Sequence, residues 1–210
     1  MILHGYFRSS ASYRVRIALS LKGLSAIQVT HHLRKGEQRS PEYLQINPQG
    51  LVPSLITDGG NTLTQSLAII EWLEETYPEP ALLPADRDER ARVRAFALAI
   101  ACDVHPVQNL KVLQHLRGLN LSEEQVSEWA AWINRGGLAA CEALLANSPG
   151  PFCFGASPTF ADICLVPQLA NAQRFNVDVS TYPRLLQADR SANEIAAYKL
   201  AAPQFQPDAE

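Results

Sequence analysis

The first part of the chain alternates short apolar runs with segments of helical spacing. Residues 2–7 form an apolar and aromatic run that predicts a buried strand. In residues 12–22 apolar side chains recur at helical spacing, and Gly23 marks the end of that helix. Residues 26–30, with isoleucine, valine and threonine, predict a second strand. A strand, a helix and a strand in this order imply a parallel strand pair.

The next segment changes its pattern. Residues 32–49 are polar and favour a loop with a short helix at about 41–45. Residues 51–57 and 61–64 predict two strands, because an Asp-Gly-Gly hairpin signal lies between them. Residues 65–77 then show the apolar spacing of a helix. Pro53 suits either an edge or strand-start position or a cis peptide bond that turns the backbone toward a ligand.

Beyond these elements, strand signals nearly disappear. Residues 79–86 are rich in proline and charge and predict a linker. The helical segments that follow are residues 87–116, 122–145 and 159–175. Thr159 and Asp162 have the spacing of a capping box, and Pro106 should kink the first of these helices. The fold class is therefore α/β plus all-α, with an α/β domain at residues 1–80 and an all-helical domain at residues 87–210.

Three serines stand where the first strand meets the first helix. Serine is a favoured N-cap residue, and we expect Ser12 to be an ordinary cap. A hydroxyl-rich turn at a helix N-terminus also binds anions, because free N–H groups and the helix dipole point to the same place. Ser9 and Ser10 are accordingly candidate anion ligands. Arg14 and Arg16 oppose the dipole there, which favours a structural carboxylate partner for each.

Composition narrows the function classes. The chain has 210 residues, 47% of them hydrophobic and 19% charged, with a net charge of −3. This balance, without a dense basic run, gives no support to nucleic-acid binding. We expect no membrane partner and a cytoplasmic location, because no signal peptide or membrane-length apolar segment is present. The four cysteines form no C-x-x-C pair and lie near no histidine pattern, so no metal is predicted and any reacting thiol must be borrowed.

Several motifs occur in an order that resembles one family. RSSASYRVRIAL, NPQGLVPSL, QSLAIIEWLEETYP, CDVHPVQNLKVL and PTFADICLVPQLANAQRFNVDVSTYP are similar to the zeta class of glutathione transferases. The resemblance covers nearly the whole chain, and its members include the maleylacetoacetate and maleylpyruvate isomerases. It implies a thioredoxin-like N-terminal domain, a helical C-terminal domain, glutathione as cofactor and a homodimer. One departure is Ala11, which stands where the class usually has a cysteine.

The resemblance implies glutathione-dependent cis–trans isomerisation of a small cis-enone dicarboxylate. Maleylacetoacetate is the first candidate substrate, maleylpyruvate is the alternative, and a general glutathione transferase is a third possibility. In these reactions the thiolate of glutathione adds reversibly to the double bond. A non-catalytic interaction module is the rival from another class. It predicts loss of the serine turn or of the Gln65–Ser66 pair, and both are present.

The same resemblance assigns roles to individual residues. Ser9 and Ser10 would stabilise the thiolate, while Arg8 and Arg174 would pair with substrate carboxylates or the developing charge. For His32 a partly exposed loop position next to His31 is an equally good interpretation, and for His105 a structural hydrogen bond is. The residues expected to bind glutathione are Ser9, Ser10, His32, Gln49, Val52, Pro53, Gln65, Ser66, His105, Gln108 and Asn109.

Overall fold

The computed structural model describes residues 1–210, and their packing divides them into two compact units. The first unit comprises Met1–Ala81 and Asn193–Glu210, and the second comprises Leu82–Ala192. The expected helical domain at 87–210 differs from this division, because the end of the chain packs with the first unit. A change in composition predicts a linker, but it does not predict that the C-terminal end of the chain packs with the first unit.

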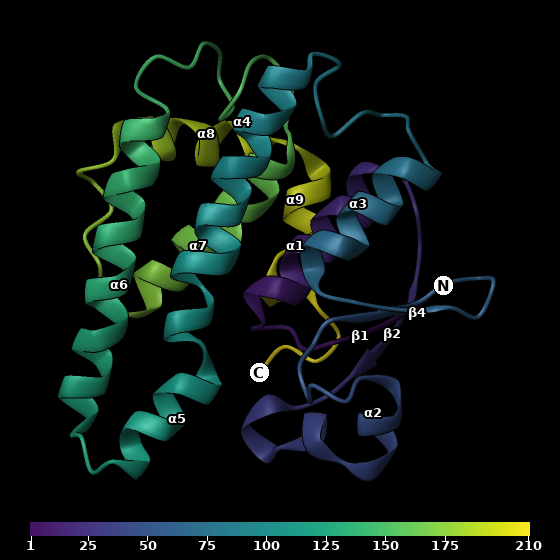
Figure 1. Ribbon diagram of the computed structural model, residues 1–210, viewed down its shortest axis with the longest axis vertical. Coiled ribbons are helices and arrows are strands. Elements are labelled where there is room, and N and C mark those ends of the chain that lie inside the picture. The colour runs from purple at the N-terminus through teal and green to yellow at the C-terminus, as the bar shows by residue number, and fades with distance from the viewer. The chain divides into compact units, whose positions relative to one another are not determined.

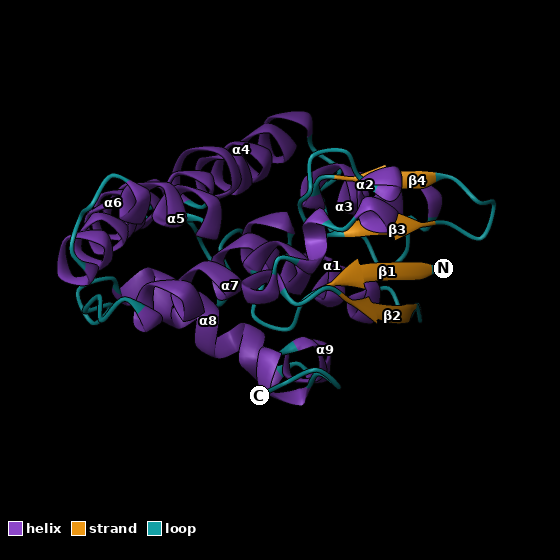
Figure 2. Ribbon diagram, turned by 90° about the horizontal axis from the view of Figure 1, so that it is seen from below, coloured by secondary structure: helices purple, strands orange, loops and turns teal.

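The first unit is built on a four-stranded mixed sheet with the order β2-β1-β3-β4. Ile2 pairs with Ile27 in the parallel β1–β2 ladder, which confirms the predicted parallel pair, while β3 runs antiparallel to both β1 and β4. Helices α1 and α3 lie on one face of the sheet and α2 on the other (Figures 1 and 2). The strands are β1 (Ile2–Gly5), β2 (Ile27–Thr30), β3 (Ser54–Ile56) and β4 (Thr62–Thr64).

Helix α1 is the buried centre of this unit. Nine of its 12 residues are buried, because α3 and α9 pack against it and it lies on one face of the sheet. A helix enclosed in this way needs no polar face, which explains its weak amphipathic pattern. The helices of the unit are α1 (Ser10–Leu21), α2 (Pro41–Ile46), α3 (Ser66–Thr76) and α9 (Ala196–Ala201), with 3₁₀ turns at Leu33–Lys35, Glu37–Arg39 and Pro203–Phe205.

The second unit is all-helical around α7. Twelve of the 15 residues of α7 are buried, and α4 and α6 pack against it. The predicted Thr159–Asp162 capping box at its start is confirmed. The helices are α4 (Arg87–Leu98), a π-helix (Ala99–Val104), a 3₁₀ turn (Pro106–Gln108), α5 (Leu110–Gly118), α6 (Glu123–Leu144), α7 (Phe160–Arg174) and α8 (Pro183–Glu194).

The single helix predicted for residues 87–116 is wrong, because the chain breaks instead of kinking. The π-helix follows α4 directly, and Asn109 adopts an extended conformation with ψ of 167° before α5 begins. Pro106 lacks an N–H and cannot continue a regular helical ladder, so the break falls next to it. Gly137 of α6 allows the close approach of this segment, since a Cβ there would overlap the side chain of Val104.

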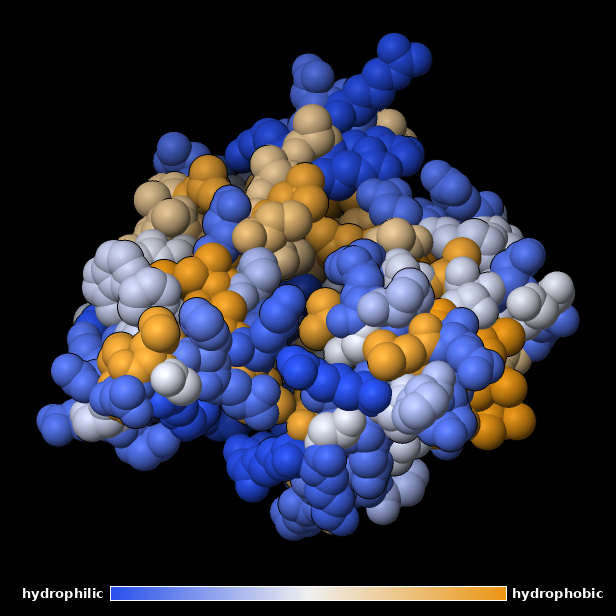
Figure 3. Space-filling model, turned by 60° about the horizontal axis from the view of Figure 1, so that its bottom comes forward, coloured by the Kyte–Doolittle hydropathy of each residue, from blue (hydrophilic) through white to orange (hydrophobic).

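The surface shows no extended apolar band on the face drawn in Figure 3, where hydrophobic side chains are interspersed with hydrophilic ones. Scattered exposed apolar residues are normal on a folded protein. None of the helices combines the length and the hydropathy that crossing a bilayer requires.

Candidate functional site

The serine turn delivers a hydroxyl to the N-terminus of α1. Ser9 is the N-cap, and its Oγ accepts a hydrogen bond from the Ser12 N–H at 3.2 Å. The expectation that Ser12 is the cap is therefore wrong. Ser12 lies inside the helix and is fully buried, with its Oγ 3.3 Å from the position of a Cβ at Gly5. Ser10 begins the helix and is 5% exposed.

No acidic side chain occupies the first turn of α1. The N–H groups of that turn carry the positive end of the helix dipole, and an anion placed there is stabilised. The local residues thus supply a hydroxyl cap and a positive potential without a carboxylate of their own in that turn. This arrangement keeps Ser9 and Ser10 as the candidates for holding a thiolate.

The two arginines of α1 face the protein interior. Arg16 donates from Nε to the Ala201 carbonyl at 2.9 Å and from Nη2 to the Phe7 carbonyl at 3.0 Å. Burial lowers the pKa of Arg16 to about 10, and nearby Asp208 opposes that shift. Arg16 thus has the expected structural role, but its hydrogen-bond partners are carbonyl oxygens, with the Asp208 carboxylate nearby. Arg14 is also buried, and its Nη1 lies 3.4 Å from the Ser66 Oγ.

A second helix start in the same unit is also free of acidic residues. Gln65 precedes α3 with φ of +67°, a conformation that a non-glycine residue adopts only when its surroundings hold it there. Its Nε2 donates to the Gln49 Oε1 at 3.0 Å, so two predicted glutathione ligands lie side by side. Ser66 opens the helix and is buried.

Val52 and Pro53 come directly before β3 in the chain. The predicted cis bond at Pro53 is confirmed. The edge position is wrong, because β3 is paired on both sides, whereas the strand-start position fits, because β3 begins at Ser54. Neither the backbone N–H nor the C=O of Val52 has a hydrogen-bond partner within the chain. A free backbone donor and acceptor on one residue can pair with an extended peptide, as a strand edge does.

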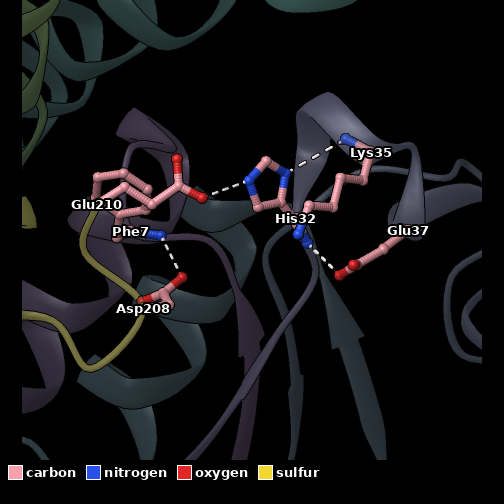
Figure 4. Close-up of polar contacts among 6 residues, drawn as sticks. All are labelled: Phe7, His32, Lys35, Glu37, Asp208 and Glu210. Atoms are coloured by element: carbon pink, nitrogen blue, oxygen red, sulfur yellow. Dashed lines mark hydrogen bonds and ion pairs between the residues drawn. The ribbon is translucent and has the colours of Figure 1, made fainter.

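His32 is a partly exposed residue of the loop after β2, and its side chain has two polar contacts. Its side chain is 14% exposed, and its Nδ1 accepts the Lys35 N–H at 3.3 Å. The Nε2 therefore carries the proton of the neutral ring and lies 2.6 Å from the Glu210 Oε1. Figure 4 shows this carboxylate facing the imidazole from the C-terminal segment. His32 thus already presents a donor suited to a carboxylate.

Four predicted residues belong to the second unit. Gln108 is 1% exposed, yet neither its Oε1 nor its Nε2 has a hydrogen-bond partner. Asn109 is the N-cap of α5 and accepts the Val112 N–H at 3.2 Å, which gives its oxygen a structural role. His105 ends the π-helix and is half-buried. Arg174 is exposed at the end of α7, not enclosed in the apolar neighbourhood that its sequence context indicates.

A hollow of about 780 Å³ lies on the second unit, on α6 and the segment after α7. It contains none of the predicted site residues. Glu124, Glu128 and Arg135 line it, and because Arg135 is already paired with Glu128, the lining does not favour a dicarboxylate and we do not take it as the substrate site. Sequence reasoning also missed the contacts of Asp208 with Phe7 and of Glu210 with His32, because no periodic pattern or motif marks residues 203–210.

Comparisons with known proteins agree with this fold. Residues 3–81 match the glutathione S-transferase N-terminal domain, and residues 135–190 match the glutathione S-transferase C-terminal domain. The maleylacetoacetate isomerase of Pseudomonas aeruginosa is 47% identical, over 99% of this chain and 98% of that protein.

Two solved structures are similar over their full length. A holo maleylpyruvate isomerase, described as a bacterial zeta-class glutathione S-transferase, is 45% identical with a TM-score of 0.97, and the match covers 100% of both chains. A maleylacetoacetate isomerase from Methylobacterium extorquens AM1 with bound malonate and glutathione is 38% identical, again with a TM-score of 0.97 and 100% coverage of both. The chain therefore belongs to the glutathione S-transferase family, in the zeta class that includes these isomerases.

Proposed function

We propose that the protein is a glutathione-dependent cis–trans isomerase that converts maleylacetoacetate to fumarylacetoacetate in aromatic amino-acid breakdown. The observation that carries this proposal is the N-terminus of α1, capped by Ser9, followed by Ser10 and free of acidic residues in its first turn. When bound, glutathione supplies the thiolate whose reversible addition to the double bond permits rotation. The chain offers no thiol in this turn, in agreement with a thiol brought by the cofactor.

The residues of the turn must favour a thiolate near neutral pH. A free thiol has a pKa of about 8.5, and lowering it by about two units requires about 2.7 kcal/mol of preferential interaction with the anion. Hydroxyl donors at Ser9 and Ser10 together with the dipole of α1 supply interactions of this size. The rate of addition then depends on how firmly these donors are held.

The remaining groups of the first unit suit a tripeptide. The start of α3, at Gln65 and Ser66, receives the γ-glutamyl carboxylate, since a helix N-terminus favours an anion. The free backbone of Val52 pairs with the cysteinyl unit. His32 and Gln49 bind the glycyl end, where the Nε2–H of His32 donates to a carboxylate.

The second unit adds binding groups of its own. The buried amide of Gln108 lacks partners within the chain, which favours a role in binding a ligand, because orphaned buried polar groups are rare. We assign Gln108 and His105 to glutathione and Arg8 and Arg174 to the substrate carboxylates. An arginine fork pairs with a carboxylate through two parallel hydrogen bonds.

Maleylpyruvate is the second candidate substrate. A maleylpyruvate isomerase of Ralstonia is 47% identical over 99% of both chains, so sequence identity favours this substrate as strongly as the 47% identity to a maleylacetoacetate isomerase favours the first. A general glutathione transferase activity would accompany either, since a stabilised thiolate attacks other electrophiles. We further propose a homodimer in the cytoplasm, on the resemblance to the zeta class.

The test is an absorbance assay with maleylacetoacetate and maleylpyruvate side by side, each with and without glutathione. Turnover of either that requires glutathione supports the isomerase, and the larger kcat/KM identifies the substrate. Glutathione binding without turnover of either would replace the isomerase by a general transferase. Absence of glutathione binding would restore the interaction module.

A variant separates substrate binding from cofactor binding. Arg174→Ala should lower kcat/KM for the substrate by about tenfold while leaving the Kd for glutathione within about twofold, because we assign this guanidinium to a substrate carboxylate and not to glutathione. Arg190→Ala, another exposed arginine, on α8, is the matched control and should change neither. Equal losses of substrate and glutathione binding would contradict this assignment.

A further inference from the structure

The C-terminal segment, residues 203–210, is anchored to the first unit at one buried residue. The Nε2 of Gln206 donates to the carbonyls of Leu200 at 2.9 Å and Ala202 at 3.0 Å. Its Oε1 accepts from the Gln28 Nε2 of β2 at 3.2 Å. Ala209 then donates its N–H to the Gln206 carbonyl at 3.0 Å, so the segment turns just after its anchor.

This anchor places Asp208 beside the turn that carries the serines. Its Oδ2 accepts the Phe7 N–H at 3.0 Å, a contact between residues 201 positions apart (Figure 4). The turn itself is closed by the Ser9 N–H, which donates to the Tyr6 carbonyl at 3.0 Å. Arg16 holds the other side, donating to the Phe7 carbonyl at 3.0 Å. Both backbone polar groups of Phe7 are thus fixed from outside the turn.

We propose that Asp208 is a positioning residue for the isomerase reaction: its carboxylate fixes the backbone of the 6–9 turn so that the hydroxyls of Ser9 and Ser10 meet the thiolate. This inference rests on the proposed function. A donor displaced by a fraction of an ångström loses much of its effect on a developing or bound charge. Phe7 lies two residues before Ser9, and the hydrogen bond from its N–H to Asp208 connects the C-terminal segment to the turn that carries this serine.

A second effect of Asp208 must be separated from this one. The carboxylate lies close enough to the buried guanidinium of Arg16 to favour its charged form. If charge were all that mattered, Asp208→Asn would act like Asp208→Ala. If the hydrogen bond to Phe7 matters, asparagine retains an acceptor oxygen and rescues the turn, whereas alanine does not.

The experiment compares full-length wild type, Asp208→Ala and Asp208→Asn. The readouts are amide hydrogen exchange at Phe7, the pKa of the bound glutathione thiol from thiolate absorbance, and kcat/KM. We expect Asp208→Ala to speed Phe7 exchange by about tenfold or more, raise the thiol pKa by about one unit, and lower kcat/KM by about tenfold. Asp208→Asn should stay within about threefold of wild type in rate, with a thiol pKa equal or slightly lower, because loss of a negative charge favours the thiolate.

Asp178→Ala is the matched control. Asp178 also accepts a backbone N–H in a turn, that of Ser180 at 2.9 Å, but in the second unit. It should leave Phe7 exchange, thiol pKa and kcat/KM unchanged. Thermal unfolding of every variant checks that the protein remains folded under the assay conditions.

Three outcomes overturn the inference. The first is unchanged Phe7 exchange in folded Asp208→Ala, which would show that the carboxylate does not fix the turn. The second is faster exchange with wild-type thiol pKa and rate, which would make the contact merely structural. The third is an asparagine variant as impaired as the alanine variant. Failure of wild type to bind glutathione would instead overturn the proposed function, and the exchange data would then decide whether Asp208 holds the turn.

Discussion

The starts of α1 and α7 differ at the third residue after the N-cap, and this difference determines whether the chain's own carboxylate occupies the helix start. Each helix has a hydroxyl N-cap, Ser9 in α1 and Thr159 in α7. Three residues later α1 has Ser12, whereas α7 has Asp162, whose Oδ2 accepts the Thr159 N–H at 2.8 Å. Its Oδ1 also accepts the Cys153 N–H at 2.8 Å. The start of α7 is therefore closed by the chain's own buried carboxylate.

This difference separates a structural helix end from one that can take a ligand. An internal carboxylate satisfies the free N–H groups and the dipole, so nothing remains for an external anion. The first turns of α4 and α6 also contain acidic residues, at Asp88, Glu89, Glu123 and Glu124. The starts of α1 and α3, where we propose that the thiolate and the γ-glutamyl carboxylate bind, contain none, and the same holds for α5, α8 and α9.

The largest effect should come from removing the hydroxyls at the start of α1. Ser9→Ala combined with Ser10→Ala should lower kcat/KM by about a hundredfold, since charge-assisted hydrogen bonds contribute about 3 kcal/mol. The free energy of unfolding should fall by only about 1 kcal/mol for the lost cap. Steady-state kinetics and urea unfolding measure the two quantities.

Ser122→Ala is the control for this double variant. Ser122 caps α6 by accepting the Gln125 N–H at 3.2 Å, so its loss should cost a similar free energy of unfolding without changing turnover. Undiminished turnover in the Ser9 and Ser10 double variant would remove both serines from the mechanism.

The closed helix start should show the reverse pattern. Asp162→Ala leaves the buried N–H groups of Cys153 and Thr159 without an acceptor, which should lower the free energy of unfolding by about 3 kcal/mol. The Kd for glutathione should stay unchanged at temperatures where the variant is folded. Urea unfolding measures the free energy of unfolding, and calorimetric titration measures the Kd for glutathione. A large loss of glutathione affinity in the folded variant would contradict the purely structural role of the α7 start.

A carboxylate added to the first turn of α1 should make this helix start resemble that of α7, where the chain's own carboxylate occupies the first turn. Ala11 is half-buried in that turn, so Ala11→Glu should stabilise the helix by about 0.5 kcal/mol through the dipole. The same charge should raise the pKa of the bound glutathione thiol and lower kcat/KM by about fivefold, because it competes with the thiolate. Ala11→Gln controls for size, and equal effects of glutamate and glutamine would show that charge is not the cause.

The sequence predicts well what depends on local pattern and less well what depends on distant contacts. The parallel pair and the Thr159–Asp162 box follow from apolar spacing and a short motif. The choice of Ser12 as cap failed because Ser9 and Ser10 are equally good cap residues, and only the path of the backbone selects Ser9. The break at residues 99–109 was missed because a π-helix leaves no period of its own in the sequence.

The C-terminal contacts show the same limit more strongly. Gln206 holds its segment through carbonyls and one side chain on separate elements, and the resulting contact of Asp208 joins residues 201 positions apart. No spacing rule connects such residues, since the closing of a long loop is determined by the finished fold. A conformation such as that of Gln65, with φ of +67°, is likewise imposed by its surroundings and not by its residue type.

The smallest effect concerns the carboxylate that the C-terminal segment brings to the first unit. Glu210 contacts the Nε2 of His32, the donor that we assign to the glycyl carboxylate of glutathione. Glu210→Gln should therefore tighten glutathione binding by about two- to threefold, a modest change because the glutamate is 53% exposed and screened by water. The glycyl ethyl ester of glutathione lacks that carboxylate and should bind both proteins equally.

Glu194→Gln is the control, since this exposed glutamate forms a loose ion pair with Lys199 at 3.9 Å on the same part of the chain. Titration calorimetry with both ligands separates the explanations. A gain for glutathione alone indicates competition at His32, whereas an equal gain for the ester indicates only the loss of a negative charge. No gain for either ligand would mean that His32 does not bind the glycyl end of glutathione. The assignment of glutathione to the first unit would then depend on the starts of α1 and α3 and on Val52.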